Sequence, residues 1–82
     1  EQFLLEEDEL AKRIFTCTET SAMVLYLLYE KSQTLEAKTV EDILNAIHNI
    51  QQDLETELLH LRIEKTLVAT RNKKEFKSKK KD

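Results

Sequence analysis

The chain has no glycine and no proline among its 82 residues, although average usage would supply roughly six and four. Both residues mark turns, so a chain without them makes few changes of direction. Their absence excludes turn-rich β-folds and any glycine-rich phosphate-binding loop. The sequence therefore predicts an all-α fold, which suits a composition of 40% hydrophobic and 35% charged residues.

Cysteine and long apolar runs are also scarce. The single cysteine, Cys17, cannot form a disulfide within the chain, and a lone thiol is typical of a reducing compartment. No run of about 18 apolar residues is present to span a membrane, and no signal peptide is recognisable. We therefore expect an intracellular protein, cytoplasmic or nuclear, without a membrane span. Because the chain begins at Glu1, we also expect a fragment of a larger protein or complex subunit.

Residues 3–32 have the period of a long amphipathic helix. Its main face repeats at mostly alternating spacings of four and three, as in a coiled coil, through Phe3, Leu10, Ile14, Cys17, Ser21, Val24 and Leu28. The segment "TCTETS", residues 16–21, is poor in helix formers, and Thr16 followed by Glu19 spells a capping box. The apolar period crosses this segment without a shift, which favours one continuous helix. A break there would give a three-helix bundle instead.

A second helix is predicted to begin at Val40, with Thr39 as its N-cap and Asp42 three residues later. Its expected main face consists of Ile43, Ile47, Ile50, Leu54, Leu58, Leu61, Lys65 and Val68. The 3-4-4 spacing from Ile47 to Leu58 departs from a heptad repeat and predicts local unwinding of a supercoil.

A short connection makes the two helices antiparallel neighbours. We expect facing residues to have numbers that add up to roughly 72. This register places Arg62 and Lys65 beside the acidic residues 6–9. The sequence thus predicts an antiparallel helical hairpin of two long helices.

Apolar residues also lie outside the two faces that a hairpin would bury. The predicted partner interface consists of Leu4, Phe15, Ala22, Tyr26, Tyr29, Leu59, Ile63 and Leu67. Such a surface exceeds the few hundred Å² of apolar patch that a soluble monomer leaves exposed. We therefore expect the hairpin to form a four-helix bundle or coiled-coil-like assembly, as a homodimer or with a helical partner subunit. A three-helix monomer would hide some of this surface internally.

Charge divides the chain into a body and a tail. Residues 1–70, the predicted interaction domain, contain 14 acidic and six basic residues, a net charge of −8. Residues 71–82 contain two acidic and seven basic residues, a net charge of +5, and are expected to be partly disordered. Candidates for contact with a polyanion such as nucleic acid are Arg71, Lys73, Lys74, Lys77, Lys79, Lys80 and Lys81.

Residues with the chemistry of catalysis or metal binding are few. Glu57 and His60 form an E-x-x-H pair, the motif that ligates metals in di-iron four-helix bundles. Such a site needs another glutamate at the same height on the neighbouring helix, where the expected register places Ile14 and Phe15. We therefore expect no catalytic residue, no metal site, no cofactor and no small-molecule substrate.

The sequence predicts a non-enzymatic structural module, a scaffold-type helical hairpin for protein–protein interaction and oligomerisation. The alternative is a dimeric binder of nucleic acid or another anionic surface that acts through the basic tail.

Overall fold

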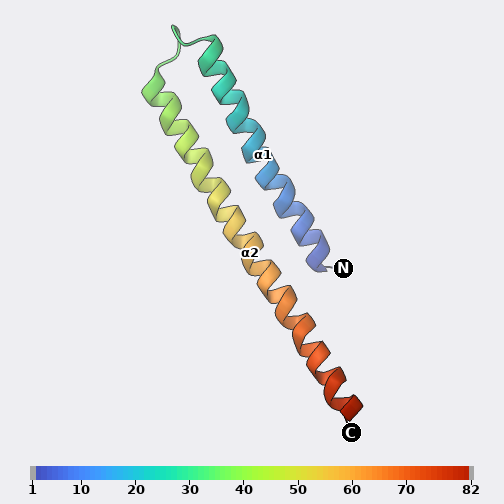
Figure 1. The fold of residues 1–82 in the computed structure, drawn as a ribbon. Coiled ribbons are helices and arrows are strands. Elements are labelled where there is room, and N and C mark those ends of the chain that lie inside the picture. Colours follow the sequence, from blue (N-terminus) through green and yellow to red (C-terminus); the bar gives the residue numbers. More distant parts are fainter. Residues whose placement is uncertain (1, 82) are drawn as a thin grey trace.

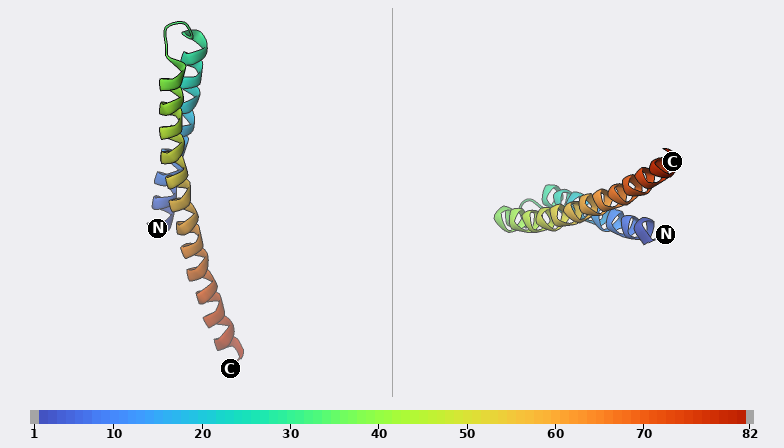
Figure 2. Two further views of the ribbon diagram at one scale, coloured as in Figure 1. Left: turned by 90° about the vertical axis from the view of Figure 1, so that its left-hand side faces the viewer. Right: turned by 90° about the horizontal axis from the view of Figure 1, so that it is seen from below.

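A computed structural model describes the backbone of residues 2–81 and the side chains of residues 2–73. Two helices, α1 (Gln2–Glu30) and α2 (Ala37–Lys81), pack against each other as an antiparallel hairpin (Figure 1). Residues 2–81 contain no strand. The Cα atoms extend over 74 × 19 × 15 Å, and two further views show a slender rod in which the helices curve gently around each other (Figure 2). The predicted all-α hairpin is confirmed.

Helix α1 runs without a break through residues 16–21, so the chain has the two-helix arrangement and not the three-helix alternative. The hydroxyls of Thr16, Thr18 and Thr20 each donate a hydrogen bond to the carbonyl four residues earlier, at 2.8, 3.3 and 2.7 Å. These bonds satisfy the threonine side chains within the helix. Weak helix propensity is outweighed here by the apolar period, which keeps one face of α1 against α2.

The start of α2 differs from the prediction. The Val40 N–H donates to the Glu36 carbonyl at 3.1 Å, so Glu36 holds the cap position and the helix begins at Ala37. The predicted cap, Thr39, already lies in the first turn, and its hydroxyl donates to the Glu36 carboxylate. Thr39 therefore supports the cap residue instead of being the cap.

The two helices meet along a regular heptad seam, which we call the intrachain seam. On α1 its buried and half-buried residues are Phe3, Glu7, Leu10, Ile14, Cys17, Ser21, Val24 and Leu28. On α2 they are Val40, Leu44, Ile47, Gln51, Leu54, Leu58 and Leu61. The spacings alternate strictly between four and three on both helices, as in a coiled coil. The predicted face of α1 is confirmed, with Glu7 as an additional member.

The predicted face of α2 is wrong in its first half. Leu44 and Gln51 occupy the seam where Ile43 and Ile50 were expected, and those isoleucines are 46% and 55% exposed. The structure keeps an unbroken heptad repeat and accommodates a polar residue, so the predicted irregularity in spacing does not occur. The Gln51 amide donates to the Thr18 hydroxyl at 3.4 Å, which gives this half-buried group a partner across the seam.

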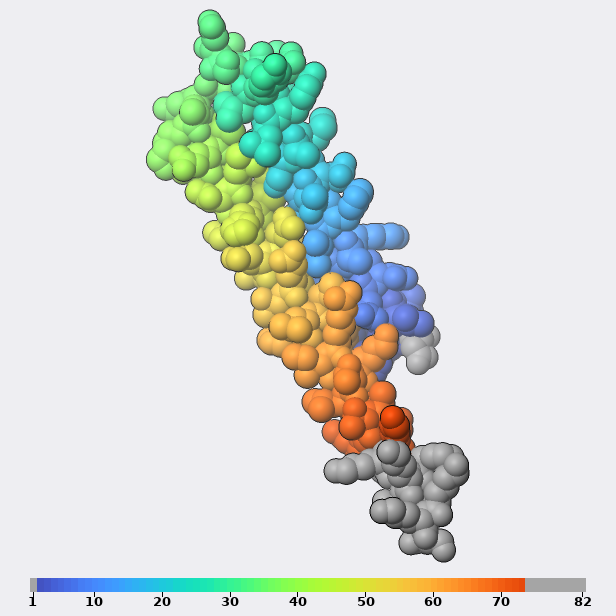
Figure 3. Space-filling view, viewed as in Figure 1, coloured from blue at the N-terminus to red at the C-terminus, as the bar shows by residue number. Residues whose placement is uncertain are grey.

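The second half of α2 has little cover. Lys65 and Val68, which were expected on its main face, are exposed, and every residue from 62 to 73 is exposed as well. The space-filling view shows α2 continuing beyond the N-terminal end of α1 (Figure 3). The backbone of α2 is helical to Lys81, and the partial disorder expected for residues 71–82 stays a prediction.

The buried core of the hairpin is thin. Among the described side chains, the buried hydrophobic residues are Leu10, Cys17, Val40 and Leu54. The half-buried residues Ile14, Ile47, Leu58 and Leu61 pack against this cluster. Two helices cover only one side of each other, so a core of this size leaves a chain of 82 residues marginally stable by itself.

Cys17 should react slowly with thiol reagents in the folded protein. Cys17 lies in the core and is only 9% exposed. A thiol reagent reacts with the thiolate form of cysteine, and only where the sulfur is accessible from solvent. An opening free energy of about 1.4 kcal/mol is enough to slow labelling roughly tenfold relative to denatured protein. Labelling rates with an aromatic disulfide reagent, in buffer and in denaturant, measure this protection. Equal rates would place Cys17 outside the core.

Candidate protein interface

Polar contacts fix the open end of the hairpin and its register. The Glu7 carboxylate accepts hydrogen bonds from Arg62 Nε at 3.2 Å and from Lys65 Nζ at 3.0 Å. The predicted position of both bases beside the acidic segment is therefore confirmed. With the contact between Thr18 and Gln51, the three cross-helix pairs have residue numbers that add up to 69, 69 and 72.

The ion pairs at Glu7 should make the stability of the hairpin depend on pH. The hydrogen bonds from Lys65 and then from Arg62 lower the pKa of the Glu7 carboxyl below its usual value of 4.5. A lowered folded-state pKa stabilises the fold above the unfolded-state value, and this contribution disappears as pH falls through the folded-state pKa. We expect Glu7→Gln to melt below the wild type at pH 7 and the difference to shrink as the pH falls well below 4.5. Circular dichroism melts at the two pH values measure it, and a difference that stayed constant would exclude the ionic cause.

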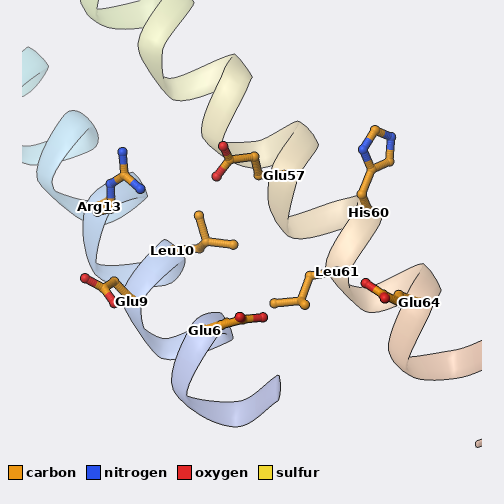
Figure 4. A pocket seen from close by; sticks show the side chains of 8 residues that line it. All are labelled: Glu6, Glu9, Leu10, Arg13, Glu57, His60, Leu61 and Glu64. Carbon is orange, nitrogen blue, oxygen red and sulfur yellow. The ribbon is translucent and has the colours of Figure 1, made fainter. Parts of the chain in front are cut away.

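The hairpin has two broad faces, one on each side of the intrachain seam. On the first, a shallow hollow is lined between the helices by Glu6, Glu9, Arg13, Glu57, His60 and Glu64 (Figure 4). Each of these residues directly precedes a position of the heptad repeat. Thr18 and Arg62, which directly follow seam residues, make their cross-helix contacts on the other side. We call the side of the preceding residues the groove face and the side of the following residues the stripe face.

The E-x-x-H pair lies on the groove face. Glu57 and His60 line the hollow together with Glu9 and Arg13. Ile14, which the expected register places at the same height, lies in the seam, and Phe15 follows it on the stripe face. The ring of His60 points away from α1 (Figure 4). Among the described residues, no group of three or more His, Cys, Asp or Glu side chains is arranged to hold a metal ion.

The groove face becomes apolar toward the loop. Heptad repetition extends the line of Arg13 and Glu57 to Leu27, Ile43 and Ile50, which are 43%, 46% and 55% exposed. Sequence reasoning missed this patch because it assigned both isoleucines to the intrachain seam. A strict heptad spacing on α2 could have predicted this patch, because it moves the seam from Ile43 and Ile50 to the residues that follow them, Leu44 and Gln51.

The stripe face carries an apolar stripe along α1. Its members each follow a seam residue by one position: Leu4, Ala11, Phe15, Ala22, Leu25 and Tyr29. Leu4, Phe15 and Tyr29 are 54%, 63% and 80% exposed. Only Asp8 and Thr18 interrupt the stripe, which repeats the four-three spacing of the seam. Helix α1 therefore has a second heptad face, about 100° around its axis from the first.

All eight residues predicted for the partner interface are exposed, but they do not share one face. The four that belong to the stripe are Leu4, Phe15, Ala22 and Tyr29. Tyr26 is two positions past the seam residue Val24, which places it on the outer edge of α1. Leu25, which was not predicted, takes its place in the stripe and is 54% exposed.

The three predicted interface residues of α2 are divided in the same way. Leu59 follows the seam residue Leu58 and lies on the stripe face. Ile63 and Leu67 line a small hollow with Arg62 and Thr66, farther along α2 than the last seam residue, Leu61. Sequence periodicity identified apolar positions on α2, but their direction depends on the seam, which the prediction placed incorrectly in part.

Residues predicted to contact a polyanion lie on the part of α2 that extends past α1. Arg71 and Lys73 are exposed. The side chains that lie outside the described residues are those of Lys74, Lys77, Lys79, Lys80 and Lys81.

No helix in the described part of the chain is long and apolar enough to cross a membrane. Comparisons with protein-family models, with curated proteins and with solved structures gave no match to this chain.

Proposed function

We propose that this chain is a non-enzymatic helical interaction module that binds another amphipathic helix through the stripe on α1. One observation carries the proposal: among the described side chains, four hydrophobic residues are buried and fourteen large hydrophobic residues are exposed. Soluble monomers rarely leave contiguous apolar patches larger than a few hundred Å². A hairpin with this distribution gains more from a partner than from its own core.

The stripe has the properties of a helix-binding surface. It keeps heptad spacing over nearly all of α1, and it contains two aromatic residues, Phe15 and Tyr29, of the type that anchors interfaces. Burial of one exposed Phe or Leu side chain contributes about 1.5–3 kcal/mol. A partner helix along the stripe would make α1 the central helix of a bundle and would stabilise the hairpin at the same time.

Solution mass and thermal stability test the proposal. Because association stabilises only the folded state, the melting temperature should rise with protein concentration. We expect a mass above the 9.7 kDa of one chain in light scattering, or strong helix formation when a partner helix is added. A 9.7 kDa monomer with a high, concentration-independent melting temperature would overturn the proposal, because such a hairpin needs no partner.

The charge asymmetry favours a second function, binding of a polyanion through residues 71–82. This segment has a net charge of +5 at the end of α2, and association of two chains would bring two such segments into one particle. Seven basic residues contacting phosphates would release counterions, so affinity for duplex DNA should fall about a thousandfold between low and physiological salt. We expect deletion of residues 71–82 to abolish DNA binding and to leave the number of chains in the assembly unchanged. Binding retained by the shortened chain would place the contact on the body.

A further inference from the structure

We propose that the stripe on α1 is covered by α1 of a second copy, packed antiparallel about a two-fold axis at the middle of the helix. This inference rests on the proposed function, because it requires the stripe to be an interface. Two-fold dimers are the commonest homo-oligomers and use one self-complementary surface. The stripe extends from Leu4 to Tyr29, so the register with complete overlap pairs residues whose numbers add up to 33.

The stripe residues are compatible with that register. Leu4 faces Tyr29 of the second copy at both ends of the contact, and Ala11 faces Ala22, which lets the helix axes approach closely. Phe15 faces Thr18 on both sides of the axis. Asp8 is the only charged residue in the stripe, and it faces Leu25. Its carboxylate is one helical turn from Lys12, at the spacing of a favourable pair.

Charge complementarity along the outer edge selects this register over its neighbours. The edge residues directly follow Leu4, Ala11, Thr18 and Leu25, and they are Leu5, Lys12, Glu19 and Tyr26. In the proposed register Lys12 lies beside Glu19 of the second copy and Leu5 lies beside Tyr26, and the symmetry doubles both pairs. A shift by one heptad in either direction brings Lys12 against Lys12, or Glu19 against Glu19, at the axis. Flanking charges of this kind set the register and orientation of coiled coils.

The size of the contact suits a stable dimer. The overlap of 26 residues corresponds to about 39 Å of helix. Phe15 and Tyr29 from the two copies supply four aromatic side chains, 63% and 80% exposed in the single chain. With about 150–250 Å² for each fully buried aromatic side chain, these four provide roughly a third of the 1,200–2,000 Å² that a specific, stable interface buries.

The same symmetry produces a four-helix arrangement. A two-fold axis perpendicular to the paired α1 helices leaves both α2 helices on one side of the pair, with their stripe faces toward each other. The stripe face of α2 is mostly polar, which suits a wetter side of the bundle.

Disulfide cross-linking tests the register. In a Cys17→Ala background, a variant with both Ala11→Cys and Ala22→Cys should oxidise to a covalent dimer. Within one chain these positions are eleven residues apart, about 16 Å along the helix, beyond the roughly 7 Å that a disulfide spans. Any bond between them therefore joins two copies. The variant with Ala11→Cys alone should stay uncross-linked, and efficient dimerisation of it would overturn the inference in favour of parallel packing.

Charge reversal provides an independent measurement on the otherwise unchanged chain. Lys12→Glu and Glu19→Lys should each weaken dimerisation roughly fivefold, since each change affects two symmetric pairs, and the double reversal should restore it. A dimeric mass without the 11–22 disulfide and without this rescue would overturn the antiparallel pairing and leave the proposed function standing. A poorly helical monomer that folds only with a different helix would do the same. A stable monomer would overturn both.

Discussion

Replacement of Leu54 by aspartate should unfold the hairpin. Leu54 is the most enclosed residue described, at 5% exposed, and it belongs to the core cluster with Leu10 and Cys17. An unpaired carboxylate in such a position costs several kcal/mol. That cost is comparable with the whole free energy of unfolding of about 5 kcal/mol that a small domain possesses. Far-ultraviolet circular dichroism should show loss of most helical signal at room temperature.

Ile50→Asp is the matched control for this variant. Ile50 lies about one turn before Leu54 on the same helix and is equally apolar, but it is 55% exposed on the groove face. Its replacement should leave the helical signal intact and change the melting temperature by only a few degrees. Leu54→Ala, which leaves a cavity and no charge, should cost about 2–5 kcal/mol and lower the melting temperature by roughly 10 °C or more. An equal loss of helical signal in Ile50→Asp and Leu54→Asp would place Ile50 in the intrachain seam, as expected from the sequence.

These variants concern a part of the hairpin that sequence reasoning placed incorrectly. On α1 the apolar residues and the heptad period coincide, so the seam was predictable from either. On α2 they separate, because Ile43 precedes Leu44 and Ile50 precedes Gln51. Local hydrophobicity cannot choose between neighbouring residues of that kind. Packing against α1 decides, and it favours the unbroken period even at the cost of a glutamine in the seam.

The sequence predicted which side chains off the seam are exposed, but it did not predict which of them share a face. Exposure of the eight named side chains follows from their positions off the main faces, and the structure confirms it. Their direction around α2 depends on the seam, so Ile63 and Leu67 could not be separated from Leu59 by periodicity alone. The pairing of Glu7 with two bases was predictable because the short loop fixes the register and hence which charged segments meet.

Phe15→Asp should dissociate the proposed dimer, and Met23→Asp should not. The two side chains lie on the same helix and are 63% and 62% exposed. An aspartate at either position should therefore have a similar effect on the folding of a single hairpin. Phe15 lies near the middle of the stripe, whereas Met23 precedes the seam residue Val24 and lies on the groove face. Loss of a central aromatic anchor typically costs at least about 2 kcal/mol, or roughly 30-fold in the dissociation constant. Sedimentation equilibrium over a range of concentrations measures both constants.

The melting curves of the same two variants separate association from folding. Since assembly and stability are linked, Phe15→Asp at high concentration should melt like highly diluted wild type, and further dilution should not change its melting temperature. Met23→Asp should keep the concentration dependence of the wild type. The opposite result, with dissociation by Met23→Asp and not by Phe15→Asp, would transfer the interface to the apolar end of the groove face. There Leu27, Ile43 and Ile50 are the remaining exposed side chains that a partner helix could cover.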